Sequence, residues 1–268
     1  MARLNVQISD KIEVFSRIGV KSFYFILTLV SVWGLAARGA VEEGLLLYLD
    51  FEAGWLERGD LSPSRHPVEG WGALEEVPGP VGFGTALELS SDPTAVVRIL
   101  GDLGAPEVLT IAFWCWFGDP KPDRWDYLFD VRSDQFQEAE GAFFFGRNRA
   151  GELRFGDLLV PADGYPRREW VHLVVTVERG RMRVTLNGLE VAAGPAVGTN
   201  LGDRVRIGNR FTEEEAFFGR LDEFALWNRL LDDEELLAIV RRPVLSARPV
   251  RARAKLPLLW GDLKRGRR

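Results

Sequence analysis

The residues that could carry chemistry in this sequence are carboxylates, arginines and aromatic side chains. The chain of 268 residues has two histidines, His66 and His172, one cysteine, Cys115, and nine tryptophans. A Ser-His-Asp triad, a multi-histidine metal site, an intrachain disulfide and a cysteine-rich zinc site are therefore disfavoured. The 39 Asp and Glu residues remain, and together with the aromatic residues they suit ligand binding.

Two carboxyl groups roughly 5 Å apart would permit retaining glycoside hydrolysis. Asp222 and Glu223 are adjacent in an otherwise apolar strand pattern. Strand alternation is expected to send them to opposite faces of a sheet, where they cannot act as a pair. Asp222 is expected to hydrogen-bond a neighbouring loop instead. The sequence therefore predicts no catalytic residues.

Charge is divided unevenly along the chain. Residues 1–40 carry five Lys/Arg and two Asp/Glu, residues 41–240 carry 19 and 36, and residues 241–268 carry ten and one. The three stretches therefore have net charges of +3, −17 and +9. The acidic body argues against nucleic-acid binding and is compatible with cations, whereas the basic end could contact an anionic surface.

The first 40 residues have the order of a secretory signal peptide. Lys11, Arg17 and Lys21 precede an apolar run of 15 residues over 23–37, and small residues follow. This run is shorter than the roughly 20 residues that cross a bilayer as a helix, which favours cleavage over anchoring. We expect export to the medium, the periplasm or the cell surface, with an uncleaved N-terminal membrane anchor as the alternative.

Short apolar or alternating runs between turn signals predict an all-β body over residues 41–242. The clearest part is a three-strand meander, in which residues 171–178 alternate and Asn187-Gly188 provides the positive φ angles of a tight hairpin. Further strands are expected at 45–50, 86–89, 95–99, 109–117, 127–132, 142–147, 152–155, 204–207 and 219–227. About a dozen short strands suit a two-sheet jelly roll.

One helix is expected near the end of this body. Asp232 or Asp233 can cap it, Glu234 and Glu235 suit the positive end of its dipole, and Pro243 stops it. Residues 243–268 mix proline and arginine with a short apolar patch. They are expected to form a flexible basic tail.

Six segments in this order resemble laminin G-like (LamG-like) jelly-roll domains of the concanavalin A-like lectin/glucanase superfamily. The segments are LYLDFE (47–52), ALEL (86–89), LTIAFW (109–114), WVHL (170–173), VTLNG (184–188) and GRLDEFALW (219–227). The resemblance implies two antiparallel sheets and a fold whose relatives bind glycans or proteins. Glucanases of the superfamily carry a Glu-x-Asp-x-x-Glu strand, which this sequence lacks, so we expect no enzyme activity.

The resemblance also implies calcium, which pentraxin-like relatives hold between two rim loops. The corresponding loops here are 132–138 and 209–215, although the spacing of the relatives' ligands is not reproduced. The expected calcium ligands are Asp134, Asn209 and one or two of Glu213, Glu214 and Glu215. Calcium is favoured because these ligands are oxygens and the body is acidic. The run of three glutamates is also typical of a solvated loop.

Sugar rings stack on aromatic faces, so exposed aromatic residues in rim loops are candidate ligand contacts. Those that lie in or beside the expected loops are Trp125, Tyr127, Phe136, Tyr165 and Phe211. Trp114 and Trp116 belong to a strand that is apolar on both faces, which predicts that they are covered.

The sequence therefore predicts an exported, non-catalytic recognition module, which binds a carbohydrate or an extracellular protein through rim loops, with calcium as its candidate cofactor. The alternatives are a glycoside hydrolase of the same fold and a structural envelope protein held by an uncleaved N-terminal helix. Nucleic acid is not an expected partner. Membrane contact is expected only through that helix or the basic tail.

Overall fold

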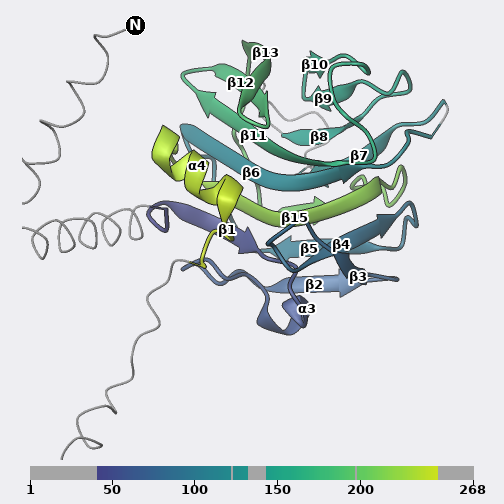
Figure 1. Ribbon diagram of the computed structural model, residues 1–268, viewed down its shortest axis with the longest axis horizontal. Coiled ribbons are helices and arrows are strands. Elements are labelled where there is room, and N and C mark those ends of the chain that lie inside the picture. Colours follow the sequence, from purple (N-terminus) through teal and green to yellow (C-terminus); the bar gives the residue numbers. More distant parts are fainter. Residues whose placement is uncertain (1–40, 122, 132–142, 197, 247–268) are drawn as a thin grey trace, which may run out of the picture.

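Two antiparallel β-sheets pack face to face in a computed structural model that describes residues 41–121, 123–131, 143–196 and 198–246 (Figure 1). This sandwich, with one short helix near its C-terminal end, confirms the predicted fold class. The segment 1–40, predicted to be a signal or anchor, and the tail over 247–268 lie outside the described residues. No helix in the described ranges is long and apolar enough to span a membrane.

Sheet A has the strand order β13-β12-β11-β6-β15-β4-β3, and β1 pairs with the C-terminal half of β15. Its strands are β1 (Leu45–Leu49), β3 (Glu75–Pro78), β4 (Thr85–Ser90), β6 (Val108–Phe117), β11 (Trp170–Glu178), β12 (Arg181–Leu186), β13 (Leu189–Pro195) and β15 (Phe218–Trp227). The meander is confirmed as β11-β12-β13, and its hairpin has Asn187 and Gly188 at φ angles of 50° and 82°.

Sheet B has the order β10-β9-β8-β7-β14-β5-β2. Its strands are β2 (Val68–Trp71), β5 (Val96–Leu100), β7 (Asp126–Asp130), β8 (Phe144–Arg147), β9 (Leu153–Phe155), β10 (Leu158–Val160) and β14 (Arg204–Ile207). The sequence pattern missed β2, β3, β10 and the short helix α3 (Trp55–Arg58). All three strands are three or four residues long and lie at sheet edges, where no long alternation marks them.

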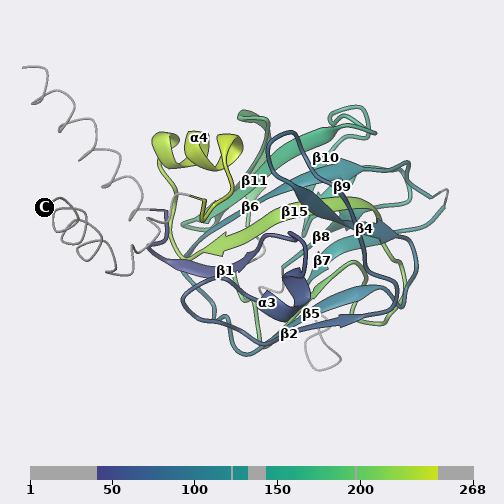
Figure 2. The same cartoon turned by 60° about the horizontal axis from the view of Figure 1, so that its bottom comes forward.

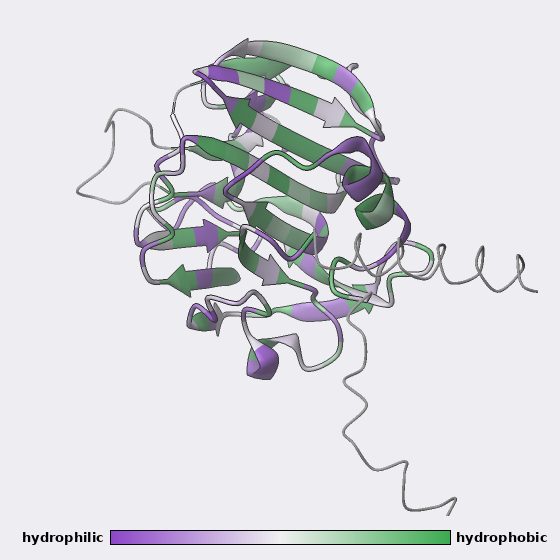
Figure 3. Cartoon of the chain, turned by 90° about the vertical axis from the view of Figure 1, so that its left-hand side faces the viewer, coloured by the Kyte–Doolittle hydropathy of each residue, from purple (hydrophilic) through white to green (hydrophobic). Residues whose placement is uncertain are grey.

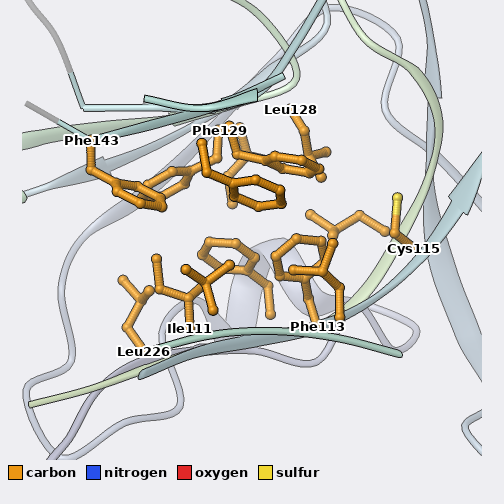
Figure 4. Close-up of a cluster of buried hydrophobic side chains, with 14 of the residues drawn as sticks. Ile111, Phe113, Cys115, Leu128, Phe129, Phe143 and Leu226 are labelled. Carbon is orange, nitrogen blue, oxygen red and sulfur yellow. The ribbon is translucent and has the colours of Figure 1, made fainter. Parts of the chain in front are cut away.

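The core lies between the sheets and is built largely from aromatic side chains. Ile111 and Phe113 of β6 face Phe129 of β7 and Phe143 across the gap (Figure 4). The ring centroid of Phe113 lies 5.7 Å from that of Phe145. Hydrophobic residues are concentrated along these central strands (Figure 3). Every second residue of β6 faces inward, which is the alternation that the sequence predicts.

A second apolar cluster covers part of the outer face of sheet A. Helix α4 (Asp233–Arg241) lies over β6, β11 and β15 (Figure 2), and its Ile239 packs in one cluster with Ala112, Val174 and Trp227. Asp232 and Glu235 form a reciprocal capping box at the N-terminal end of the helix. Val244 is buried in the same cluster, so the folded body continues at least two residues past the predicted boundary at 242.

His172 lies on the outer face of sheet A, where its burial makes the stability of the fold depend on pH. Its side chain is 3% exposed, and its ring meets that of Trp114 edge-on at 5.1 Å. Burial lowers the pKa of His172 from 6.5 to about 4. As the pH falls below 6.5, His172 binds a proton in the unfolded chain but not in the folded chain. The free energy of unfolding therefore decreases with falling pH, down to about pH 4, where the folded chain binds the proton as well.

We expect His172 to make the free energy of unfolding about 2 kcal/mol lower at pH 5 than at pH 7. The variant His172→Gln should lose this part of the pH dependence, because glutamine does not titrate. Urea denaturation of both proteins at the two pH values measures the difference. An identical pH dependence in the variant would contradict the expectation.

Candidate ligand-binding cleft

Loops from both sheets meet at one rim of the sandwich and enclose an open cleft of about 420 Å³. Its walls come from the β4–β5 loop, the β6–β7 loop, the β8–β9 turn and the β14–β15 loop. The lining residues are Ser91, Pro93, Lys121, Asp123, Arg124, Trp125, Arg149, Glu213, Glu214, Glu215 and Ala216. A neighbouring hollow of about 250 Å³ shares Pro93 and Glu213 with this cleft and adds the exposed ring of Trp71.

A buried arginine joins the strand ends next to two loops of this cleft. Arg147 is 0% exposed and binds the carboxylate of Asp126, with Nε 2.9 Å from Oδ1. The same guanidinium donates to the main-chain oxygens of Gly118 and, at 3.1 Å, Phe218. Gly118 and Asp126 flank the β6–β7 loop, and Phe218 follows the β14–β15 loop. The ion pair therefore sets the positions of the loops that form the cleft walls.

Trp125 is the aromatic wall of the cleft. Its half-buried ring stacks on that of Tyr127, with centroids 5.9 Å apart and an interplanar angle of 18°. The guanidinium of Arg154 lies 5.8 Å from the Trp125 centroid. The neighbouring ring and guanidinium thus stiffen the indole, as a stacking platform for a ligand requires.

The other predicted aromatic contacts do not form such a platform. Tyr127 and Phe211 are 5% and 7% exposed, and the guanidinium of Arg210 covers both rings. Tyr165 is 5% exposed and donates its hydroxyl hydrogen to the Gly151 carbonyl at 2.7 Å. The interpretation of these three as ligand-facing is wrong because all three side chains are almost fully buried. Phe136 lies outside the described residues.

The predicted calcium ligands are engaged in other ways. Glu213 binds Arg98 at 2.7 Å and Arg206 at 3.5 Å, and Glu215 binds Arg210 at 3.2 Å. Two arginines beside one carboxylate oppose the binding of a cation there. Nowhere in the described ranges do three or more His, Cys, Asp or Glu side chains converge as a metal site.

Asn209, another predicted calcium ligand, is fully buried and donates through Nδ2 to the Pro93 carbonyl at 2.7 Å. Its Oδ1 has no hydrogen-bond partner among the described residues. Glu214 lines the cleft, and Asp134 lies outside the described residues. Calcium at this rim therefore stays a prediction.

Three cations of the cleft remain available to a ligand. Lys121, Arg124 and Arg149 are exposed, and none of them forms an ion pair with another described residue. Each donates hydrogen bonds but accepts none. Together with the carboxylates of Asp123 and Glu214 they form a polar lining beside the Trp125 ring.

The Asp222-Glu223 pair contradicts simple alternation. A bulge interrupts the pairing of β15 with β6 between Asp222 and Ala225, and Glu223 has a φ of 53°. Leu221 and Phe224 both enter the core, so the two carboxyl groups both lie on the outer face of sheet A. The expectation of opposite faces is wrong because the extra residue changes the period of the strand.

Both carboxyl groups of this bulge are buried. Glu223 accepts from the Tyr48 hydroxyl at 2.8 Å and from the Val244 N–H at 2.7 Å. Burial raises the pKa of Glu223 to about 8. Asp222 accepts through Oδ1 from the Glu223 N–H, rather than from a neighbouring loop as predicted. The pair is therefore sealed within the fold and does not face the cleft.

Comparison with known proteins agrees with this architecture. A laminin G-like family model, described as the concanavalin A-like lectin/glucanases superfamily, matches residues 97–237, which is more than half of the chain. The chain belongs to this superfamily. No curated protein matches this laminin G-like domain.

Solved structures with the same fold include binding domains. Domain 4 of AbnA, a GH43 extracellular arabinanase from Geobacillus stearothermophilus, in complex with arabinotriose, has a TM-score of 0.50 and 17% identity, covering 76% of this chain and 97% of that one. The binding domain of Paraclostridial Mosquitocidal Protein 1 has a TM-score of 0.55 and 16% identity, covering 74% and 52%. The receptor binding domain of botulinum neurotoxin C/D mosaic serotype has a TM-score of 0.56 and 12% identity, covering 74% of this chain and 51% of that one.

These likenesses show the fold alone, and the laminin G-like domain spans about half the length of the two toxin structures.

The sequence pattern did not identify Trp71 as a candidate contact. Trp71 is 53% exposed, and the guanidinium of Arg98 lies 5.4 Å from the centroid of its ring. Its one signal is a tryptophan beside two glycines, Gly70 and Gly72, in a stretch with too few apolar residues for a core strand.

Proposed function

We propose that this domain is a non-catalytic recognition module that binds a carbohydrate in the rim cleft. The observation that carries the proposal is the stacked, half-buried ring of Trp125 beside Lys121, Arg124 and Arg149, three cations that form no ion pair with another described residue. An aromatic face can stack on a sugar ring while cationic donors bind its oxygens. Such a shallow, polar site suits an oligosaccharide better than an apolar small molecule.

Two solved structures of the same fold support this reading. Domain 4 of the arabinanase is bound to arabinotriose, and a botulinum neurotoxin DC binding domain is in complex with SialylT. We extend carbohydrate binding to this chain as a proposal, because the identities are 17% and 14%. An extracellular protein is the alternative ligand, and the same fold also occurs in glucanases.

The test is a glycan array probed with the purified full-length chain, followed by titration calorimetry with the best binder. We expect Trp125→Ala to weaken binding at least about tenfold, since removing the stacking face deletes a central contact. Trp170→Ala is the matched control, because Trp170 is also half-buried but does not line the cleft.

Equal loss in both variants would point to a general effect on folding and contradict the cleft. A chain that binds no glycan on the array would favour a protein partner. Release of reducing sugar from a bound glycan would contradict the non-catalytic proposal.

We also propose that the domain is exported, which rests on the charged and apolar order of residues 1–40. Mass spectrometry of the native N-terminus tests this. A new N-terminus near residue 40 in the exported fraction supports it, whereas Met1 or Ala2 retained in a membrane fraction supports the anchored alternative.

A further inference from the structure

An exposed tryptophan lines the hollow next to the rim cleft. Trp71 ends β2, the edge strand of sheet B (Figure 1), and is 53% exposed. The guanidinium of Arg98 lies 5.4 Å from the centroid of the indole, and Glu213 binds that guanidinium at 2.7 Å. An arginine that is itself ion-paired therefore lies against the indole, while much of the residue stays open to solvent.

The lining of this hollow depends on a close approach of two segments. Gly72 has a φ of 71°, and a Cβ atom at this position would lie 2.5 Å from the carbonyl carbon of Thr94. Glycine therefore allows the end of β2 to contact the β4–β5 loop. Pro93 of the same loop accepts a hydrogen bond from Nδ2 of the buried Asn209 at 2.7 Å. The hollow is thus lined by three segments that pack against one another or are hydrogen-bonded.

Two polar atoms of the lining residues lack partners. Asn209 Oδ1 and Arg98 Nε are buried, and neither has a hydrogen-bond partner within the described part of the chain. The hydrogen bond from Asn209 Nδ2 to the Pro93 carbonyl leaves Oδ1 as the free acceptor. Buried polar atoms are rarely left unsatisfied. A ligand hydroxyl, directly or through a bridging water, can donate to Asn209 and accept from Arg98.

The charged side chains at the hollow neutralise each other. Arg98 and Glu213 line it and form an ion pair. Arg206 lies 3.5 Å from the same carboxylate and also interacts with the charge of Asp130 on the next strand. An acidic group would have to compete with Glu213 for Arg98. An uncharged sugar ring, with hydroxyl groups and an apolar face, suits this lining better.

The hollow and the rim cleft are contiguous. Pro93 and Glu213 line both of them, whereas Trp71 lines the hollow and Trp125 lines the cleft. The Glu213 side chain is 60% exposed, so its carboxylate can accept hydrogen bonds from a ligand at this boundary. A chain of two or more sugar rings can therefore place one ring against each tryptophan.

We propose that the hollow at Trp71 is a second sugar subsite, which takes an uncharged ring of an oligosaccharide that also occupies the rim cleft. The inference rests on the proposed function and names its ligand class, an oligosaccharide of at least two rings rather than a single terminal sugar. Trp71 stacks on the ring, and Asn209, Arg98 and Glu213 bind its hydroxyl groups.

The test is titration of the full-length chain with cello-, xylo- and arabino-oligosaccharides of one to six units, by calorimetry and, for single units, by NMR. We expect affinity in the series that binds to rise at least about tenfold from one unit to six, because longer chains add the contacts of Trp71. Trp71→Ala should abolish this gain. Trp71→Phe, which keeps an aromatic face, should retain most of it.

Leu56→Ala is the matched control, because Leu56 is also an exposed apolar residue but does not line the hollow. It should bind like the wild type, and equal losses in Leu56→Ala and Trp71→Ala overturn the proposal. Wild-type affinity that does not rise with chain length overturns it as well.

The same titrations separate this subsite from the proposed function. If Trp71→Ala binds every length like the wild type while Trp125→Ala binds weakly, the second subsite is overturned and binding in the cleft stands. A wild-type chain that binds none of the three series also overturns the subsite, and the glycan array then decides the proposed function on its own.

Discussion

Replacing Arg147 with methionine is expected to lower the free energy of unfolding by about 3–5 kcal/mol, because it leaves the buried Asp126 carboxylate without its counter-charge. Asp126 is 3% exposed, and the Gly118 and Phe218 carbonyls would lose their donor as well. Methionine fills much of the same space, so lost packing contributes little. Urea denaturation at pH 7 measures the effect.

The control for this prediction removes both charges. The double variant Asp126→Leu with Arg147→Met replaces a buried ion pair by apolar residues, which is often nearly neutral. It should therefore be more stable than Arg147→Met alone. If the double variant is the less stable of the two, the buried charge is not what destabilises the single variant.

Arg147 also connects stability to the proposed function. Its partners flank the β6–β7 loop and follow the β14–β15 loop, which together carry Trp125 and the three glutamates of the cleft wall. In the fraction of Arg147→Met that remains folded, we expect glycan affinity to fall because these walls are no longer held in place. Trp125→Ala, by contrast, should affect affinity with little change in stability.

The second large effect is expected at the centre of the sandwich. Phe113→Ala should destabilise the protein by about 3–5 kcal/mol, because truncation of a buried aromatic ring leaves a cavity that the two sheets cannot close. Phe113 is 2% exposed, and its ring centroid lies 5.6 Å from that of Phe224 and 5.7 Å from that of Phe145 (Figure 4). Guanidinium denaturation measures the loss.

Two further variants serve as comparisons for the loss of stability in Phe113→Ala. Phe113→Leu keeps most of the volume and should be less destabilising than the alanine variant. Leu189→Ala, at a residue 73% exposed on the β12–β13 hairpin, should change stability by no more than about 0.5 kcal/mol. Equal effects at Phe113 and Leu189 would contradict the burial of Phe113 in the core.

Local patterns predicted much of the fold. The inward and outward residues of β6 follow the alternation that its sequence shows, and Asn187-Gly188 forms the expected hairpin. Asp232, one of the two capping residues that the sequence offers, caps α4. Each of these features depends on residues within one strand, turn or helix end, so the order of side chains along the chain is enough to specify it.

The candidate site was predicted less well. Of the described aromatic candidates only Trp125 presents its ring to the cleft, whereas Tyr127, Tyr165 and Phe211 are buried. All four lie in or beside loops, and residue type alone does not tell which way a loop residue turns. That direction is set by partners far along the chain, as the Arg210 guanidinium over Tyr127 shows.

The sequence by itself determined the all-β sandwich, the meander, the capped helix and the superfamily, because these follow from short-range periodicity and from the order of several motifs. Only the tertiary structure decided that the Glu213 carboxylate meets Arg98 and Arg206, and that Asp222 faces the β3–β4 hairpin from a bulge. The physical reason is distance along the chain. A binding or cation site is made by charges that approach only when separate loops and strands pack, and strand alternation carries no information about that approach.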